Sequence, residues 1–364
     1  MPLFIFLIVD GNGETQPICM FFVQNEDEAS LTKMIEIFKN LNPSWVHTKT
    51  VLTDKDLTER LVFKNEMPQI NLQICLFHVL RTFSREVTIS KMNITESQRL
   101  DILQELQDIT YSRSRSDFEI KVKHFLDNAP NQLVKSYFQK NWLSIKEEWV
   151  LCFRHNVMNL GENTTNRLES FFGKLKEVIR RKKTMYQLIE DILEFIESMQ
   201  QEKSFKSIRM QTSKPTSTPK TSLEVLYQDY VTEFALKLLT PQFLKVDSVQ
   251  VIDYITVHTQ DGPIFPNNDC CTCSFFCKYN LPCCHMIALE KFNKRDVFLK
   301  SAIAKRWTKN YNMVSGVTQN RKSISIHQKK QLFNKKFRKV DHLLKNASSS
   351  IAELGMQDFL YKLK

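Results

Sequence analysis

The chain has 364 residues, of which 42% are hydrophobic and 25% charged, an ordinary globular balance with room for two domains. Its longest apolar run, Leu3 to Val9, is far shorter than the roughly 20 residues of a membrane span and follows no basic segment, so we expect neither a membrane protein nor a secretory signal. The formal net charge of +11 belongs to residues 301–364, because the first 300 residues balance to zero.

The first segments alternate between strand and helix patterns. Leu3 to Val9 predicts a strand, Gly11-Asn12-Gly13 a tight hairpin turn, and Pro17 to Val23 the returning strand. Asn25 can cap a helix that ends at Asn42-Pro43. A strand over residues 49–53, a short helix over 57–63 and a strand over 70–76 follow. The resulting order, β-β-α-β-α-β, predicts a mixed sheet covered by helices.

From about residue 78 to 200, amphipathic helical patterns replace the strand signals. Residues 204–222 contain SKPTSTPKTS and no apolar periodicity, so they predict a linker and the main domain boundary. A helix over residues 223–239, a strand over Val249 to Val257 and a short helix through Ala288 and Leu289 complete the predicted elements.

Nine cysteines are distributed unevenly, with six of them between residues 270 and 284. An odd number that includes adjacent pairs is a poor disulfide framework, so we expect a reducing compartment. Within the cluster, the spacing predicts a zinc site whose ligands are Cys271, Cys273, Cys283 and His285. Three thiolates and one imidazole close the tetrahedron and leave no position for water, which indicates a structural Zn2+.

Side-chain alternation supports this ligand set. Cys-x-Cys on an extended segment places both sulfurs on the same side, and Cys-x-His at a turn entering a helix can complete the site. Incidental buried thiols are a less favoured interpretation, because six thiols and a histidine rarely gather in so few residues. Three further cysteines stay open as competing ligands: Cys270, Cys277 and Cys284.

The cluster resembles a known family of zinc fingers. Cys-x-Cys-x9-Cys-x-His, with Phe275, Leu281-Pro282 and His285-Met-Ile-Ala at its flanks, resembles the SWIM finger, and Lys305-Arg306-Trp307 is similar to the Arg-Trp that often follows it. The first part of the chain resembles a Mutator-like transposase domain in five segments: Phe6-Leu-Ile-Val-Asp10-Gly, Asn42-Pro-Ser-Trp45, Thr53-Asp54-Lys55, Cys75-Leu-Phe-His78 and Asn163-Thr-Thr-Asn166-Arg-Leu-Glu169-Ser170. Together these motifs resemble most closely the animal zinc finger SWIM domain-containing proteins derived from such transposases.

The resemblance implies an RNase H-like fold whose Asp, Asp, Glu triad holds two Mg2+ ions for phosphodiester cleavage. Asp54 matches the second Asp and Glu169 the Glu. In the family the first Asp precedes the strand that here begins at Leu3, so we expect an N-terminally truncated domain in which Asp54 and Glu169 are vestigial. Asp10 aligns with a later strand end and is not assigned to the triad.

Other interpretations of the matched residues stay open. Asp54 could instead cap the helix that begins near Leu57, and Glu169 could be a solvated acid in a first helical turn. Cys75 and His78 match a family position with a structural or metal-proximal role, although a lone pair of this kind usually belongs to a core.

We therefore expect an α+β fold with four regions. A transposase-derived, RNase H-like domain covers residues 1–203 and carries a helical insertion at about 85–160. The linker 204–222 leads to a SWIM zinc-finger region at 223–310, with the finger core at 249–292. A basic helical tail covers 311–364.

The tail carries paired basic residues that could contact phosphates or direct nuclear import. We expect nucleic-acid contacts at Lys335, Lys336, Arg338 and Lys339. A smaller basic patch follows Glu169 and consists of Lys174, Lys176, Arg180, Arg181, Lys182 and Lys183. A solvated surface is the alternative interpretation of both.

These observations predict a nuclear, zinc-binding protein that acts as a nucleic-acid- or protein-binding module without catalytic activity. DNA and protein are the expected partners, with no membrane and no small-molecule substrate. The alternative is a metal-dependent DNA transposase or nuclease, which would use Mg2+ and a first catalytic Asp upstream of this chain.

Overall fold

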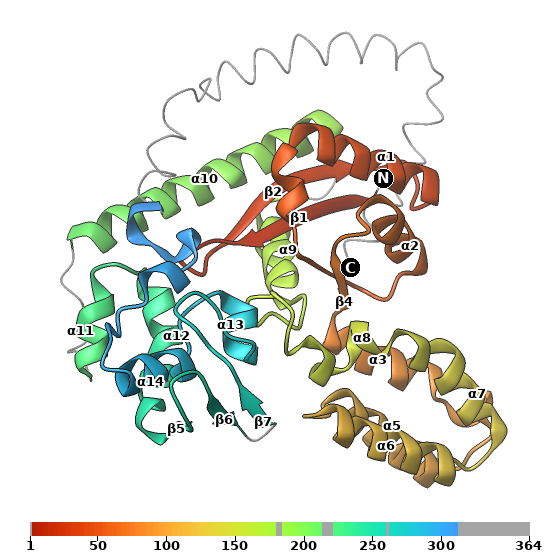
Figure 1. Ribbon diagram of the computed structural model, residues 1–364. Helices are drawn as coiled ribbons and strands as arrows, with labels where there is room; N and C mark the ends of the chain where they lie inside the picture. Colours follow the sequence, from red (N-terminus) through yellow and green to blue (C-terminus); the bar gives the residue numbers. More distant parts are fainter. Residues whose placement is uncertain (1, 180–183, 213–220, 260–261, 312–364) are drawn as a thin grey trace. The chain divides into compact units, whose positions relative to one another are not determined.

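The computed structural model describes residues 2–179, 184–212, 221–259 and 262–311 (Figure 1). The predicted tail beyond residue 311, with Lys335, Lys336, Arg338 and Lys339, lies outside the described residues, as do 180–183 of the smaller basic patch. Two compact units divide the chain. The first gathers Met1–Glu26, Leu168–Pro241 and Ala304–Lys364, and the second gathers Asp27–Arg167 and Gln242–Ile303.

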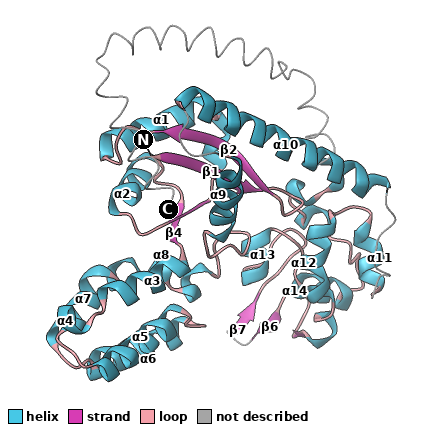
Figure 2. Cartoon of the chain, turned by 180° about the vertical axis from the view of Figure 1, so that it is seen from behind, coloured by secondary structure: helices cyan, strands magenta, loops and turns pink. Residues whose placement is uncertain are grey.

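The first unit is built on a hairpin packed against two helices. Strands β1 (Leu3–Val9) and β2 (Thr15–Phe22) pair antiparallel as predicted. Helices α9 (Asn166–Val178) and α10 (Met185–Thr212) lie against this pair (Figure 2). Their shared core consists of Ile5, Phe171, Leu175, Leu188, Ile192 and Phe195. Because α10 continues to Thr212, the first part of the segment predicted as a linker is helical, and 213–220 lie outside the described residues.

The same unit contains the Lys305-Arg306-Trp307 motif, which forms a short 3-10 helix. Trp307 is fully buried and stacks on Phe234 of α12 (Glu233–Phe243), with ring centroids 6.0 Å apart. Arg306 donates a hydrogen bond to the carbonyl of Val9. The motif therefore anchors the end of β1 to α12, while the short helix α11 (Ser222–Gln228) precedes α12 in the chain.

The second unit begins with the α-β-α-β part of the predicted order. Helix α1 (Glu28–Leu41) is capped by Asp27, which accepts from the backbone N–H of Ser30, and not by Asn25 as expected. Strand β3 (Thr50–Thr53) pairs parallel with β4 (Asn71–Ile74), and α2 (Leu57–Glu66) connects them. The strands predicted to form one mixed sheet thus belong to two separate two-stranded sheets, β1–β2 antiparallel and β3–β4 parallel, and the α+β class is confirmed.

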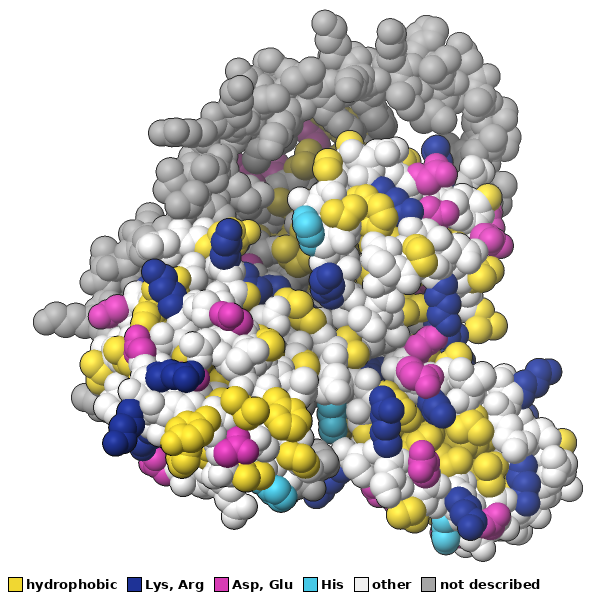
Figure 3. All heavy atoms as spheres, in the orientation of Figure 1, with side chains coloured by type: hydrophobic (Ala, Val, Ile, Leu, Met, Phe, Trp, Pro, Cys, Tyr) yellow, Lys and Arg dark blue, Asp and Glu magenta, His cyan; other side chains and the backbone are white. Residues whose placement is uncertain are grey.

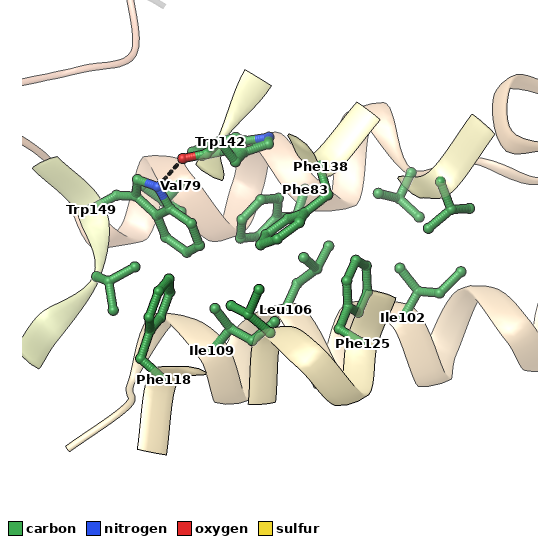
Figure 4. Close-up of a cluster of buried hydrophobic side chains, with 14 of the residues drawn as sticks. Val79, Phe83, Ile102, Leu106, Ile109, Phe118, Phe125, Phe138, Trp142 and Trp149 are labelled. Atoms are coloured by element: carbon green, nitrogen blue, oxygen red, sulfur yellow. Dashed lines mark hydrogen bonds between the residues drawn. The ribbon is translucent and has the colours of Figure 1, made fainter. Parts of the chain in front are cut away.

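Helices fill the region predicted as an insertion. They are α3 (Leu76–Glu86), α4 (Ile89–Met92), α5 (Glu96–Thr110), α6 (Arg115–Asn128), α7 (Gln132–Asn141) and α8 (Lys146–Trp149). Figure 4 shows their aromatic core, in which the indole N–H of Trp149 donates to the carbonyl of Trp142 at 2.9 Å. At the margin of this core, Glu148 is buried with Arg60, and their closest side-chain atoms are 2.6 Å apart.

The remaining part of the second unit is a small antiparallel sheet followed by two short helices. The strands are β5 (Gln250–Val251), β6 (Val257–Thr259) and β7 (Gly262–Ile264), and the helices are α13 (Ser274–Tyr279) and α14 (Cys284–Phe292). The strand predicted over residues 249–257 is interrupted, because the Asp253 carboxylate accepts from the backbone N–H groups of Ile255 and Thr256 and forms a turn. Among the described residues, no helix is long and apolar enough to cross a membrane.

Candidate metal centre

The four predicted zinc ligands come together at the two short helices of the second unit. Cys271 and Cys273 precede α13, Cys283 immediately precedes α14, and His285 lies in the first turn of α14. Their sulfur and ring-nitrogen atoms all lie within 4.8 Å of one another. Cys271 and Cys283 are buried. This Cys3His cluster is consistent with a zinc finger and could hold a zinc ion.

Local conformation explains how the two halves meet. Helix α13 ends at Tyr279. Its C-cap, Asn280, has a φ of 49° and turns the chain through the left-handed region, and the following Leu281 is fully buried. The chain then runs extended into Cys283, at the N-terminus of α14. On the other side, Cys271 and Cys273 lie in irregular backbone rather than in the strand that the Cys-x-Cys pattern suggested. The backbone N–H of Cys273 donates to the Cys271 sulfur at 3.4 Å.

The three competing cysteines do not join this group of ligand atoms. Cys270 is exposed. The Cys277 sulfur lies 3.6 Å from the carbonyl oxygen of Thr272, and the backbone N–H of Cys284 donates to the side chain of Gln242 at 3.3 Å. Within the described residues, the cluster therefore contains only the four side chains that the spacing predicted.

The electrostatics of the cluster fit a bound cation. Burial raises the pKa of Cys283, whereas hydrogen bonds with Cys271 and Cys283 lower the pKa of Cys273. Burial alone would lower the pKa of His285, but hydrogen bonds to Cys271 and Cys273 outweigh it and raise that pKa to about 12. The Nδ1 atom of His285 is buried and has no hydrogen-bond partner in the described part of the chain. A divalent ion bound by the three thiolates and the imidazole would displace the protons that these groups share.

The segment that carries the four ligands contacts a turn of the same unit that is distant in the sequence. The backbone N–H of Leu160 donates to the carbonyl of Lys278 at 3.3 Å, and the Asn280 amide lies 3.8 Å from the sulfur of Met158. The carbonyl of Met158 in turn accepts from the hydroxyl of Thr50 at 2.8 Å. The finger is thus linked through residues 158–161 to strand β3.

A second group of possible metal ligands lies at the carboxyl ends of β3 and β4. Asp54 follows β3, Cys75 follows β4, and His78 lies in the first turn of α3. Because the two strands are parallel neighbours, their ends meet at one edge. The ligand atoms of the three side chains lie within 4.8 Å of one another, and His78 Nδ1 is 2.9 Å from Asp54 Oδ1.

Thr165 completes the surroundings of Cys75. Its backbone N–H and its hydroxyl lie 3.2 Å and 3.3 Å from the Cys75 sulfur. Burial raises the pKa of Cys75, but hydrogen bonds with His78 and Thr165 outweigh it and lower that pKa to about 7. The hydrogen bond that His78 donates to the Asp54 carboxylate raises the pKa of His78 to about 10. Sequence reasoning did not assign Thr165 a role, although it lies in a segment that resembles the transposases.

The two acids matched to the catalytic triad belong to different compact units. Asp54 lies in the second unit and Glu169, in the first turn of α9, lies in the first. Helix α2 is capped by Asp56, whose carboxylate accepts from the backbone N–H of Glu59, so Asp54 is not the cap that the alternative interpretation proposed.

Comparison with known families adds one match. Residues 1–73 match the family model described as the RNaseH-like domain of zinc finger SWIM domain-containing protein 1/3. The N-terminal part of the chain is therefore an RNaseH-like domain of the zinc finger SWIM domain-containing protein family, which confirms the resemblance. The match includes Asp54 and ends before Cys75, so it does not extend to the remaining residues of the two clusters.

Proposed function

We propose that this chain, with its RNaseH-like domain of the zinc finger SWIM domain-containing family, is a zinc-stabilised nuclear protein that binds DNA without cleaving it. The observation that carries the absence of cleavage is the contact of Asp54 with His78, at 2.9 Å. In a two-metal mechanism the catalytic carboxylates bind Mg2+, a hard cation that prefers oxygen ligands. Here Asp54 faces an imidazole and a thiol instead.

Asp10 supports the same proposal, because its carboxylate is used within the hairpin. Its Oδ1 accepts from the backbone N–H groups of Asn12 and Glu14, each at 2.9 Å. Its Oδ2 accepts from the Gln16 amide at 3.2 Å and lies 2.9 Å from Nζ of Lys203. If the Asp10 carboxylate bound a metal ion instead, it would lose the hydrogen bonds that stabilise the turn between β1 and β2.

DNA is the favoured partner because of where the charge lies. On the face shown in Figure 3, the Lys and Arg side chains of the described residues alternate with Asp and Glu, so they form no continuous basic patch there. The net charge of +11 resides in residues 301–364 instead. Neutralising phosphates releases condensed counterions, so binding through this segment would depend little on base sequence and steeply on salt.

A salt titration of duplex binding tests the proposal. Fluorescence anisotropy would compare the full chain with two fourfold Lys/Arg→Gln variants of equal net charge. The first changes Lys335, Lys336, Arg338 and Lys339, and the charge-matched control changes four exposed lysines elsewhere, Lys33, Lys91, Lys123 and Lys140. If all four tail residues contact phosphates, the log–log salt slope should fall by about three to four for the first variant.

Each result of this titration has a definite meaning. The control should keep nearly the full slope, because its lysines lie outside the proposed contact segment. Equal losses in both variants would mean that only net charge matters, and unchanged binding in both would refute the contacts of the four tail residues with phosphates. No binding of the duplex by the full chain would refute DNA binding and leave a protein partner as the better explanation.

A cleavage assay tests the second half of the proposal. The full chain should release no product from labelled duplex ends in Mg2+ or Mn2+. Cleavage that is present and lost in Asp54→Asn would overturn the proposal and favour a metal-dependent transposase or nuclease.

A further inference from the structure

We propose that Asp54, Cys75 and His78 form a second metal site, for Zn2+ or a similar borderline transition-metal ion, separate from the Cys3His finger. The three side chains offer one oxygen, one sulfur and one nitrogen, and these atoms lie within 4.8 Å of one another without an ion present. The proposal does not rest on DNA binding and stands or falls independently of it.

The ligand types select the class of metal. Mg2+ binds oxygen almost exclusively, so an imidazole and a thiolate would be poor ligands for it. Zn2+ and Co2+ accept sulfur, nitrogen and carboxylate oxygen together. The residue that the family resemblance assigns to Mg2+ chemistry, Asp54, would therefore serve a softer ion in this chain.

The geometry requires only a small adjustment. Zinc lies about 2.0–2.3 Å from its ligands, so tetrahedral ligand atoms lie about 3.3–3.8 Å from one another. His78 Nδ1 and Asp54 Oδ1, now hydrogen-bonded at 2.9 Å, would have to separate slightly as the proton leaves. The Asp54 side chain can supply this movement, because it is 53% exposed, whereas that of His78 is 22% exposed and Cys75 is fully buried.

Thr165 would act as a positioning residue. Its backbone N–H and hydroxyl both point to the Cys75 sulfur, at 3.2 Å and 3.3 Å, and these bonds would orient and stabilise a thiolate. Cys75 is itself held by its backbone N–H, which donates to the carbonyl of Thr53 at 2.9 Å. Three protein ligands leave one position for water on the exposed side of Asp54, which also gives the ion a path of entry.

The burial of Cys75 argues against reading the same three residues as a Cys-His-Asp hydrolase. A nucleophilic sulfur has to reach the carbonyl of a substrate, and Cys75 is fully buried. A metal ion needs far less access, because it could approach the sulfur from between Asp54 and His78.

Metal counting on the full chain tests the proposal. The protein would be stripped of metal, reloaded with Zn2+ and analysed by inductively coupled plasma mass spectrometry. The wild type should hold two zinc ions, Cys75→Ser and Asp54→Asn one each, and the finger variant Cys273→Ser one. Cys152→Ser is the matched control, since Cys152 is also a buried thiol but belongs to no ligand group in the described residues, and it should hold two.

Cobalt provides a second readout. Co2+ bound in Cys273→Ser should still show a thiolate-to-cobalt charge-transfer band, and this band should be absent from Cys273→Ser/Cys75→Ser. Asp54→Asn controls for misfolding, because the side chain at position 54 is half-exposed and asparagine keeps the shape of aspartate without its negative charge. One zinc ion in the wild type, unchanged in Cys75→Ser and Asp54→Asn but lost in Cys273→Ser, would overturn the second site and leave the finger intact.

Discussion

Gly161→Ala should weaken the contact between the finger and the turn at residues 158–161. Gly161 has a φ of 77°, and a Cβ built there would lie 2.2 Å from the hydroxyl oxygen of Tyr279, the last residue of α13. Two separate costs follow. The left-handed backbone costs an L-residue about 1–2 kcal/mol, and the side chain of Tyr279 has to move by more than about 1 Å to restore an ordinary contact.

The movement of Tyr279 should also disturb the hydrogen bond from Leu160 to Lys278, which contributes about 0.5–1.5 kcal/mol. Together these effects predict a loss of about 2–3 kcal/mol in the free energy of unfolding of the second unit. Gly173→Ala is the matched control. Gly173 lies inside helix α9 with nothing within 4 Å of its Cβ position, so the substitution should stabilise that helix by up to about 1 kcal/mol.

Urea denaturation and hydrogen exchange of peptides covering 155–165 and 271–285 would measure the effect. Tyr279→Phe separates the two costs, because it removes the closest atom and leaves the ring carbon at 3.2 Å. In the Tyr279→Phe protein, Gly161→Ala should lower the free energy of unfolding by about 1 kcal/mol less than it does in the wild type. The loss that remains measures the cost of the left-handed backbone at position 161. An equal cost in both backgrounds would refute the steric argument, and no cost in either would refute the contact between the turn and the finger.

Three further predictions concern the second unit. Chelation of zinc, or Cys273→Ser, should increase hydrogen exchange in residues 271–292 and 158–161 while the helical core around Trp149 stays protected, and uniform loss of protection would contradict this. Glu148→Gln should lower the free energy of unfolding, measured in urea, by about 3 kcal/mol, because it leaves the buried Arg60 without its anionic partner. The double variant Arg60→Leu/Glu148→Leu should lose less stability, because it leaves no buried charge unpaired. A larger loss in the double variant than in Glu148→Gln would contradict the argument. Desolvation, followed by repulsion from Arg60, lowers the pKa of Lys55 to about 8, whereas an unfolded lysine keeps its proton to about 10.4. Unfolding therefore binds a proton between these values, and stability should rise over pH 8–10 in the wild type but not in Lys55→Met.

The sequence predicted the elements that depend on local signals. The hairpin of β1 and β2 was predicted from an apolar run, a Gly-Asn-Gly turn and a second run, and the order of helices and strands up to β4 followed in the same way. The finger ligands were equally accessible, because all four lie within fifteen residues and their spacing carries the information. The boundaries were less accurate where a side chain caps the backbone, as Asp27 does for α1 and Asp253 does in the interrupted strand.

Only the tertiary structure decided how distant residues combine. No spacing in the sequence relates Asp54 to His78, or Thr165 to Cys75, since they meet through the parallel pairing of β3 with β4 and the return of the chain ninety residues later. The sequence likewise left open whether Asp54 caps α2, and the structure gives that role to Asp56 instead. Each of the two compact units is likewise assembled from segments that are far apart in the sequence. Local periodicity determines which face of a helix or strand is buried, whereas the partner that buries it depends on how the whole chain packs.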